Sequence, residues 1–202
     1  MEDNYQKIIQ QNLRRLFADP SVNLEKNLPA VREQNAFIFQ AFGQECRLQP
    51  DGIRLGETHQ TGVLGILISL YALNASPRQC VTEPLKAYKD FRNSMPYAGA
   101  FVTHAQQPLV PHVSQIKADK EKIIEKFKGE EASETAGGDF SILVYPLPKI
   151  ALCYVFYEAD EDFSASATCL FANNADAFMP IDGLADVAEY TSKAILEIIF
   201  SL

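Results

Sequence analysis

The sequence predicts an α+β fold in which a largely antiparallel sheet packs against several helices. Helical apolar periodicity stands near both ends of the chain, strand-like runs joined by turn residues form two groups between them, and strand and helix do not alternate regularly. Strands joined by short turns pair antiparallel, whereas parallel pairing requires a long crossover. For 202 residues with 47% hydrophobic residues, we expect a single domain over residues 1–202.

The amino-terminal segment predicts one helix followed by a small β-meander. Apolar residues recur at helical spacing from Tyr5 to Phe17, and Asp19-Pro20 closes that segment. Three strand-like runs then lie between residues 36 and 55, the last two separated by Pro50-Asp51-Gly52. Proline presets φ and glycine accepts positive φ, so this tripeptide predicts a tight turn within a meander.

A second helix is expected from Thr58, as its cap, to about Asn74. Its residues are apolar on nearly every side, which is typical of a central, buried helix. Gly62 and Gly65 lower helix propensity within it, and they indicate close approach of a neighbouring backbone.

The middle of the chain predicts short helices and one acidic loop. Residues 84–107 favour two helical pieces broken at Pro96, and apolar spacing from Ile116 to Phe127 favours a surface helix. The stretch 129–138 is acidic, rich in glycine and low in hydrophobic residues. We expect any subdomain seam to lie there.

The carboxyl-terminal third predicts a three-stranded meander and a final helix. Strands are expected over 140–145, 150–157 and 165–171, and the helix follows Pro180-Ile181-Asp182. Residues 150–157 are apolar at every position, which indicates a strand covered on both faces.

Several blocks of this chain resemble a known family. They are Val144-Tyr145-Pro146-Leu147-Pro148, Tyr154 to Phe163, Cys169-Leu170-Phe171-Ala172-Asn173, Phe178-Met179-Pro180 with the closing helix, Gly62 to Leu73, and Pro84 to Arg92. Together they resemble the prokaryotic domain-of-unknown-function family DUF3786. The resemblance implies a setting in anaerobic bacteria and archaea, where some relatives carry an added iron–sulfur segment that this chain lacks. It supplies no catalytic residues.

Charge and targeting signals limit the partners. The net charge is −8 and the pI near 4.9, and acidic residues interrupt the basic run from Lys117 to Lys128. Because nucleic-acid binding needs clustered Lys and Arg, we expect neither nucleic acid nor an anionic membrane as a partner. The acidity indicates solubility, or a preference for cationic ligands or basic protein surfaces. No signal peptide or apolar run of spanning length is present, so we expect a cytoplasmic protein.

The four cysteines, at positions 46, 80, 153 and 169, do not have the spacing of an iron–sulfur or zinc site. We therefore expect no iron–sulfur cluster in this chain. No cofactor is evident from the sequence, and a divalent metal stays open. Cys153 and Cys169 lie in apolar strand-like runs, where a thiol is usually a small buried hydrophobic group.

The candidate metal site is the run Glu158-Ala159-Asp160-Glu161-Asp162-Phe163. Clustered carboxylate oxygens suit Mg²⁺ or Ca²⁺, and paired carboxylates can act as general acid and base. The glycine and the twelfth-position glutamate of a calcium loop are missing. Glu158, Asp160 and Asp162 are therefore candidate ligands, with a solvated acidic turn as the alternative reading.

The three histidines are the second group of candidates. His59 follows Glu57 at the expected helix start, where the pair would bind an anion or activate a water. His104 and His112 lie eight positions apart around two prolines, which is not the ligand spacing of a helix. A surface or cap histidine is the alternative reading.

Arg92 and Tyr97 form the third candidate group. The segment Pro96 to Phe101 would line a pocket in which these two residues supply polar groups for an anionic ligand. Aromatic core packing accounts for the same residues. Nucleophile-elbow, phosphate-loop and dinucleotide-binding patterns do not occur in the sequence.

Two functions remain open. One is a non-catalytic accessory module that binds a small molecule or a partner protein, in anaerobic prokaryotic metabolism as the resemblance implies. The other is a metal-assisted hydrolase or related enzyme that uses the acidic loop 158–162 and nearby histidines. Convergence of two histidines with Asp160 or Asp162 would favour the enzyme, and separated histidines would favour the module.

Overall fold

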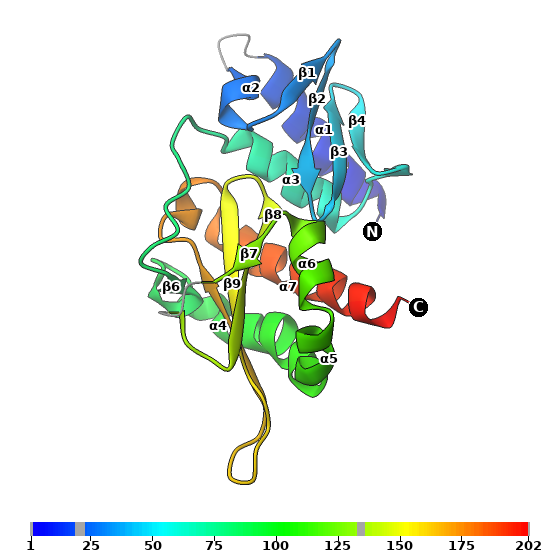
Figure 1. The fold of residues 1–202 in the computed structure, drawn as a ribbon. Helices are drawn as coiled ribbons and strands as arrows, with labels where there is room; N and C mark the ends of the chain where they lie inside the picture. The colour runs from blue at the N-terminus through cyan, green and yellow to red at the C-terminus, as the bar shows by residue number, and fades with distance from the viewer. Residues whose placement is uncertain (1, 19–22, 133–135, 202) are drawn as a thin grey trace.

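In the computed structural model, which describes residues 2–18, 23–132 and 136–201, two antiparallel sheets lie end to end with helices beside them (Figure 1). The order is β1-β2-β3-β4-β5 in sheet A and β6-β10-β9-β8-β7 in sheet B. The strands of sheet A are β1 (Val31–Glu33), β2 (Ala36–Ala41), β3 (Gln44–Gln49), β4 (Gly52–Leu55) and β5 (Thr58–His59). Those of sheet B are β6 (Lys86–Ala87), β7 (Glu130–Glu131), β8 (Phe140–Leu147), β9 (Ile150–Tyr157) and β10 (Ser166–Phe171).

The α-helices are α1 (Glu2–Ala18), α2 (Leu24–Asn27), α3 (Val63–Leu73), α4 (Ala98–Phe101), α5 (Val113–Ala118), α6 (Lys120–Phe127) and α7 (Ile181–Phe200). The predicted α+β class, with both meanders and the first and last helices, is confirmed. Asp19-Pro20, expected to close the first helix, lies outside the described residues.

Helices α1 and α3 pack together beside sheet A (Figure 1). Gly65 makes this contact close, because a Cβ there would lie 2.6 Å from Ile9 Cδ1 and 2.8 Å from the Gln60 carbonyl oxygen. The predicted close approach is therefore confirmed at Gly65. It is wrong at Gly62, where a Cβ would have no neighbour within 4 Å.

The predicted helix cap at Thr58 is wrong. Gly56, with a φ of +55°, turns the chain back, so that Thr58 pairs with Leu55 and His59 with Arg54 as strand β5. The helix begins only after Gly62. His59 thus stands on a sheet edge and not at a helix start.

The prediction of two helical pieces broken at Pro96 is also wrong. Lys86 and Ala87 form strand β6 against β10, and the 3₁₀ turn η1 (Tyr88–Asp90) follows. Pro96 lies in the first turn of η2 (Met95–Tyr97), where the missing N–H is tolerated, and the chain winds on through α4.

The winding continues through the π-helix η3 (Val102–Gln106) and the 3₁₀ helix η4 (Gln107–His112) into α5. The surface helix expected from Ile116 to Phe127 is interrupted at Asp119, which separates α5 from α6.

Strand β9 is covered on both faces, as its apolar sequence predicted. Every residue of it except Tyr157 is buried. Tyr154 and Phe156 face the main core with α7, whereas Cys153 and Val155 face a smaller apolar cluster on the other side of the sheet.

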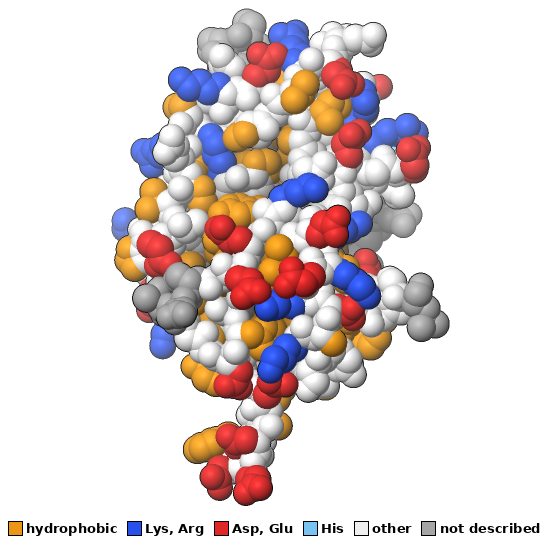
Figure 2. Space-filling view, in the orientation of Figure 1, with side chains coloured by type: hydrophobic (Ala, Val, Ile, Leu, Met, Phe, Trp, Pro, Cys, Tyr) orange, Lys and Arg blue, Asp and Glu red, His pale blue; other side chains and the backbone are white. Residues whose placement is uncertain are grey.

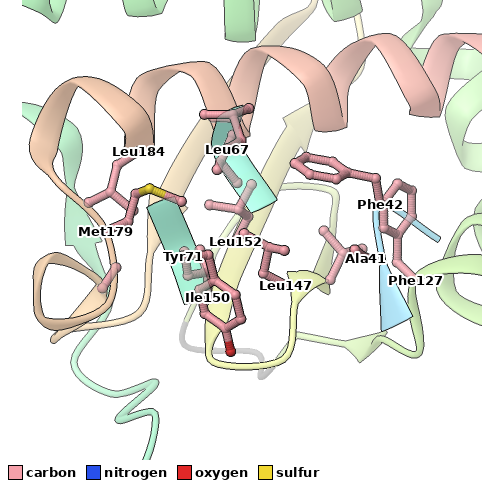
Figure 3. Close-up of a cluster of buried hydrophobic side chains, with 14 of the residues drawn as sticks. Ala41, Phe42, Leu67, Tyr71, Phe127, Leu147, Ile150, Leu152, Met179 and Leu184 are labelled. Carbon is pink, nitrogen blue, oxygen red and sulfur yellow. The ribbon is translucent and has the colours of Figure 1, made fainter. Parts of the chain in front are cut away.

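One continuous apolar core contains residues of α1, sheet A, α3, sheet B and α7. Figure 3 shows Ala41 and Phe42 beside Phe127 and Leu147 in this core. The Phe42 N–H donates to the Pro146 carbonyl at 2.7 Å, which joins the two sheets through their backbones. In the loop 129–138, expected as a seam, β7 pairs with β8, and residues 133–135 lie outside the described residues.

Within the described ranges, no helix combines the length and apolarity needed to cross a membrane.

Candidate functional site

The most prominent surface feature is the hairpin formed by β9 and β10. The two strands pair out to Tyr157 and Ser166, and the loop between them projects clear of the rest of the molecule (Figure 1). Figure 2 shows acidic side chains and an apolar side chain at the end of this projection. We call residues 158–165 the hairpin loop.

Asp160 holds the tip of the hairpin loop in one conformation. Its Oδ1 accepts the backbone N–H groups of Asp162, at 2.9 Å, and Phe163, at 2.7 Å. Its own N–H donates to the Phe163 carbonyl at 2.9 Å. A short carboxylate that accepts backbone N–H groups two and three positions ahead is an Asx turn, so the tip is ordered by its own sequence.

Lys117 and Asp139 hold the base of the hairpin loop. The Lys117 ammonium forms an ion pair with the Glu158 carboxylate. Asp139 Oδ2 accepts the Glu158 N–H at 2.7 Å, while the Asp139 N–H donates to the Phe156 carbonyl at 2.8 Å. The acidic loop is thus held at Glu158, where it leaves β9, by α5 and by the segment that leads into β8.

The charge at the tip is unbalanced. Lys117 offsets Glu158, but Asp160, Glu161 and Asp162 have no basic side chain within ion-pair distance in the described parts of the chain. All three side chains are exposed. Phe163, beside them, is 74% exposed. An exposed aromatic ring among three uncompensated carboxylates is the outstanding chemical feature of this surface.

An open groove of about 530 Å³ lies beside the base of the hairpin, with Lys117, Lys120 and Asp139 among its lining residues. Its two lysines already have acidic partners. Lys120 bonds to Glu131 at 2.6 Å, and this contact raises the pKa of the ammonium. Both lysines of the groove are therefore paired with carboxylates, and Asp139 is bonded to a backbone amide.

The candidate metal ligands do not form a metal-binding group. Glu158 is committed to Lys117, and Asp160 Oδ1 to two backbone amides. Among the residues that the structure places, no set of three or more His, Cys, Asp and Glu side chains has the arrangement to hold a metal ion. Metal binding by Glu158, Asp160 and Asp162 stays a prediction without geometric support.

The histidines do not meet at the hairpin tip. Glu57 and His59 are exposed in the β4–β5 hairpin, at the other end of the molecule (Figure 1). His104 is exposed on the π-helix η3. His112 ends η4, where its ring meets Phe200 edge-on at a centroid distance of 4.9 Å. No convergence with Asp160 or Asp162 is present in the described ranges.

Arg92 and Tyr97 flank an aromatic cluster and are both exposed. The segment behind them is filled by core packing: Tyr88 stacks on Phe101 at 4.5 Å, and both rings contact Phe171. The aromatic-packing interpretation therefore describes Phe101 well. The anion-binding role of Arg92 and Tyr97 stays a prediction.

The four cysteines are free thiols. Burial raises the pKa of Cys153 to about 12, with Glu83 adding to the shift, and burial likewise raises the pKa values of Cys46, Cys80 and Cys169. A thiol with a raised pKa is not a nucleophile near neutral pH.

Three residues with defined roles were not identified from the sequence. Lys117 and Asp139 hold the loop from distant segments, and no local pattern points to them. Phe163 carried a signal, because an aromatic residue directly after four carboxylates in five positions is out of place in a solvated turn.

A family model described as "Domain of unknown function (DUF3786)" matches residues 21–194, which is most of the chain. No curated protein and no solved structure matches the chain.

Proposed function

The chain belongs to the DUF3786 family. We propose that this family member is a non-catalytic binding module of the cytoplasm and that it holds a partner protein through the hairpin loop. The observation that carries the proposal is Phe163, 74% exposed on a fixed, projecting tip.

The ring of Phe163 supplies the affinity in this proposal. Full burial of a phenylalanine side chain is worth about 1.5–3 kcal/mol. Aromatic side chains at the centre of an interface commonly dominate its binding energy. The partner accordingly offers an apolar pocket that takes one aromatic ring.

The carboxylates of Asp160, Glu161 and Asp162 supply the specificity. They directly precede the ring in the sequence and carry negative charge that no described side chain neutralises. A pocket rimmed by Lys and Arg complements this pattern and speeds the encounter, and salt weakens both effects. The partner is therefore a protein with a basic surface, in keeping with a net charge of −8 on this chain.

The order of the loop lowers the cost of binding. Two backbone bonds to Asp160 Oδ1 at the tip and the Lys117–Glu158 pair at the base set the loop conformation in the free protein. A loop ordered before association loses less conformational entropy when it binds.

The state of the cysteines and the positions of the histidines in the described structure support a non-catalytic role. Burial raises the pKa of every cysteine thiol, and the candidate histidines lie apart in the described structure. Four free thiols also agree with a reducing compartment, which supports the cytoplasmic part of the proposal.

Site-specific photocrosslinking tests the proposal. A benzophenone amino acid replaces Phe163, which keeps an aromatic side chain at the tip, and the protein is irradiated in cells of its natural host. We expect one discrete adduct, identified by mass spectrometry as a protein with a basic surface. A second probe at Val31, which is 67% exposed on the edge of sheet A, is the matched control.

The charge requirement is tested in the same experiment. Glu161→Gln with Asp162→Asn removes two charges and leaves the Asp160 turn intact, so the adduct yield should fall and should fall further in added salt. Adducts that are the same at positions 31 and 163, or no adduct at 163, would overturn the proposal.

A further inference from the structure

Lys149 is the one buried side chain among the charged residues that the structure describes, with 7% of it exposed. It stands in the turn between β8 and β9, at the opposite end of β9 from the hairpin loop. A lysine in such a turn ordinarily extends into solvent, because a buried ammonium loses its hydration.

The ammonium of Lys149 has no acidic partner in the described parts of the chain. Its Nζ donates to the Ser76 carbonyl at 2.5 Å and lies 5.8 Å from the centre of the Phe178 ring. Burial lowers its pKa, and the positive charge of Lys26 lowers it further. The charged side chain that shifts this pKa is thus another cation.

Two buried hydroxyl groups beside Lys149 also lack partners. Tyr71 Oη and Ser76 Oγ are without a hydrogen bond among the described residues. Figure 3 shows the Tyr71 oxygen at the margin of the apolar cluster, next to the turn that joins β8 and β9. Burial raises the pKa of Tyr71, and the nearby Lys149 backbone N–H partly offsets this without reaching hydrogen-bond geometry.

These groups share one chemical requirement, which is an acceptor. A buried hydroxyl without a hydrogen bond is destabilising, and a buried ammonium that lacks an acceptor is more so. The donors come from three segments: Tyr71 from α3, Ser76 from the connection after it, and Lys149 from the turn between β8 and β9. Exposed Lys26, on α2, adds a second cation on the solvent side.

We propose that Lys149, Tyr71 and Ser76 form a binding site for an oxyanion, specifically a phosphate group, which enters past Lys26. A phosphate oxygen accepts from the ammonium in a charge-assisted bond, and the remaining oxygens accept from the two hydroxyls. Its double charge matches the two lysines, which a carboxylate would not. The site is independent of the partner-binding hairpin loop.

Thermal melting at constant pH tests this site, with sodium phosphate compared against sodium chloride at equal ionic strength. A ligand that binds the native state raises Tm by mass action. We expect the wild-type Tm to rise with phosphate and to saturate, and to change little with chloride. Lys149→Met should abolish the phosphate response. Lys89→Met, at an exposed lysine, should leave it unchanged.

Two milder variants keep the test decisive where Lys149→Met fails to fold. Tyr71→Phe and Ser76→Ala each remove one hydroxyl and little volume, and each should raise the half-saturating phosphate concentration several-fold. A wild-type response equal in phosphate and chloride would overturn the proposal. Wild-type phosphate affinity in Lys149→Met, or in both hydroxyl variants, would overturn it too.

Glycerol phosphate identifies the source of the group. A shift at least as large as that with inorganic phosphate assigns the site to a phosphate carried on an organic molecule. A response to inorganic phosphate alone assigns it to the free ion. Failure of both phosphates in the wild-type protein contradicts the site.

Discussion

Replacement of Ser192 by alanine should destabilise the platform that carries the hairpin. Ser192 Oγ, on α7, donates to the Ala105 carbonyl of the π-helix at 2.6 Å and lies 3.0 Å from Tyr154 Oη of β9. All three residues are buried, so this bridge ties α7, the π-helix and sheet B together out of contact with water.

The magnitude follows from that geometry. Removal of the hydroxyl deprives a buried carbonyl of its donor, at a cost of about 1–3 kcal/mol. For a chain of this size each kcal/mol shifts Tm by about 2–4 °C, so about 2 kcal/mol corresponds to a fall of roughly 4–8 °C. Tyr154→Phe removes the contact with Ser192 and the bond that the Tyr154 hydroxyl donates to the Ala188 carbonyl at 3.2 Å. It should still cost less, because the shorter bond from Ser192 to Ala105 survives it.

Differential scanning calorimetry of Ser192→Ala, Tyr154→Phe and a control variant measures how far each substitution lowers Tm. Ser201→Ala is the control, because the Ser201 hydroxyl bonds to Glu197 on the same helix but is exposed. The expected order of destabilisation is Ser192→Ala, then Tyr154→Phe, then Ser201→Ala near zero. A Ser192→Ala protein that melts with the wild type would refute the bridge as a stabilising element.

Three further outcomes are expected. Gly129→Ala should lower Tm markedly, because its Cβ would lie 2.2 Å from the Leu143 carbonyl oxygen. Gly99→Ala, with no atom within 4 Å of its Cβ, should leave Tm unchanged or slightly raised. Equal Tm values for the two variants would contradict the close approach of residue 129 to β8. Stability should fall as pH rises through about 9 to 12, because burial raises the pKa values of Cys153 and Tyr88 to about 12 in the folded protein. The unfolded chain then loses these protons at lower pH than the folded protein does. A Tm that stays constant over that pH range would refute this prediction. Mg²⁺, Ca²⁺ and Zn²⁺ should not raise Tm beyond an ionic-strength control, because Asp160 and Glu158 are already engaged; a saturable rise lost in Asp162→Asn would restore the metal site.

Elements whose pattern is local were predictable from the sequence. The uninterrupted apolar run of β9 predicted a strand covered on both faces, since alternation is lost only when both faces are buried. The period of the final helix predicted α7 in the same way.

Elements set by tertiary pairing were not predictable. Thr58 has the chemistry of a helix cap, but the Gly56 turn places it opposite Leu55, and strand pairing prevails over capping. Pro96 was expected to break a helix. It lies instead in the first turn of η2, where a backbone N–H has no partner within the helix, so the missing N–H of proline costs little.

The candidate site shows the same division. The sequence predicted the acidic composition of the hairpin loop and its position between two strands. Its projection and its anchoring by Lys117 and Asp139 depend on residues 19 to 41 positions away. The buried ammonium of Lys149 bonds to the Ser76 carbonyl, 73 positions away, and no local pattern in the sequence indicates this contact.

A trimmed hairpin tests the central claim most directly. Residues 159–164 are replaced by Asn-Gly, a pair suited to a two-residue hairpin turn, and the affinity for the protein captured at position 163 is measured by calorimetry. The hydrogen bonds that the structure describes at the tip are confined to the tip itself, so we expect an unchanged Tm. We also expect at least about a tenfold loss of affinity, which is about 1.4 kcal/mol. Undiminished affinity of a correctly folded trimmed protein would contradict the assignment of partner binding to this loop.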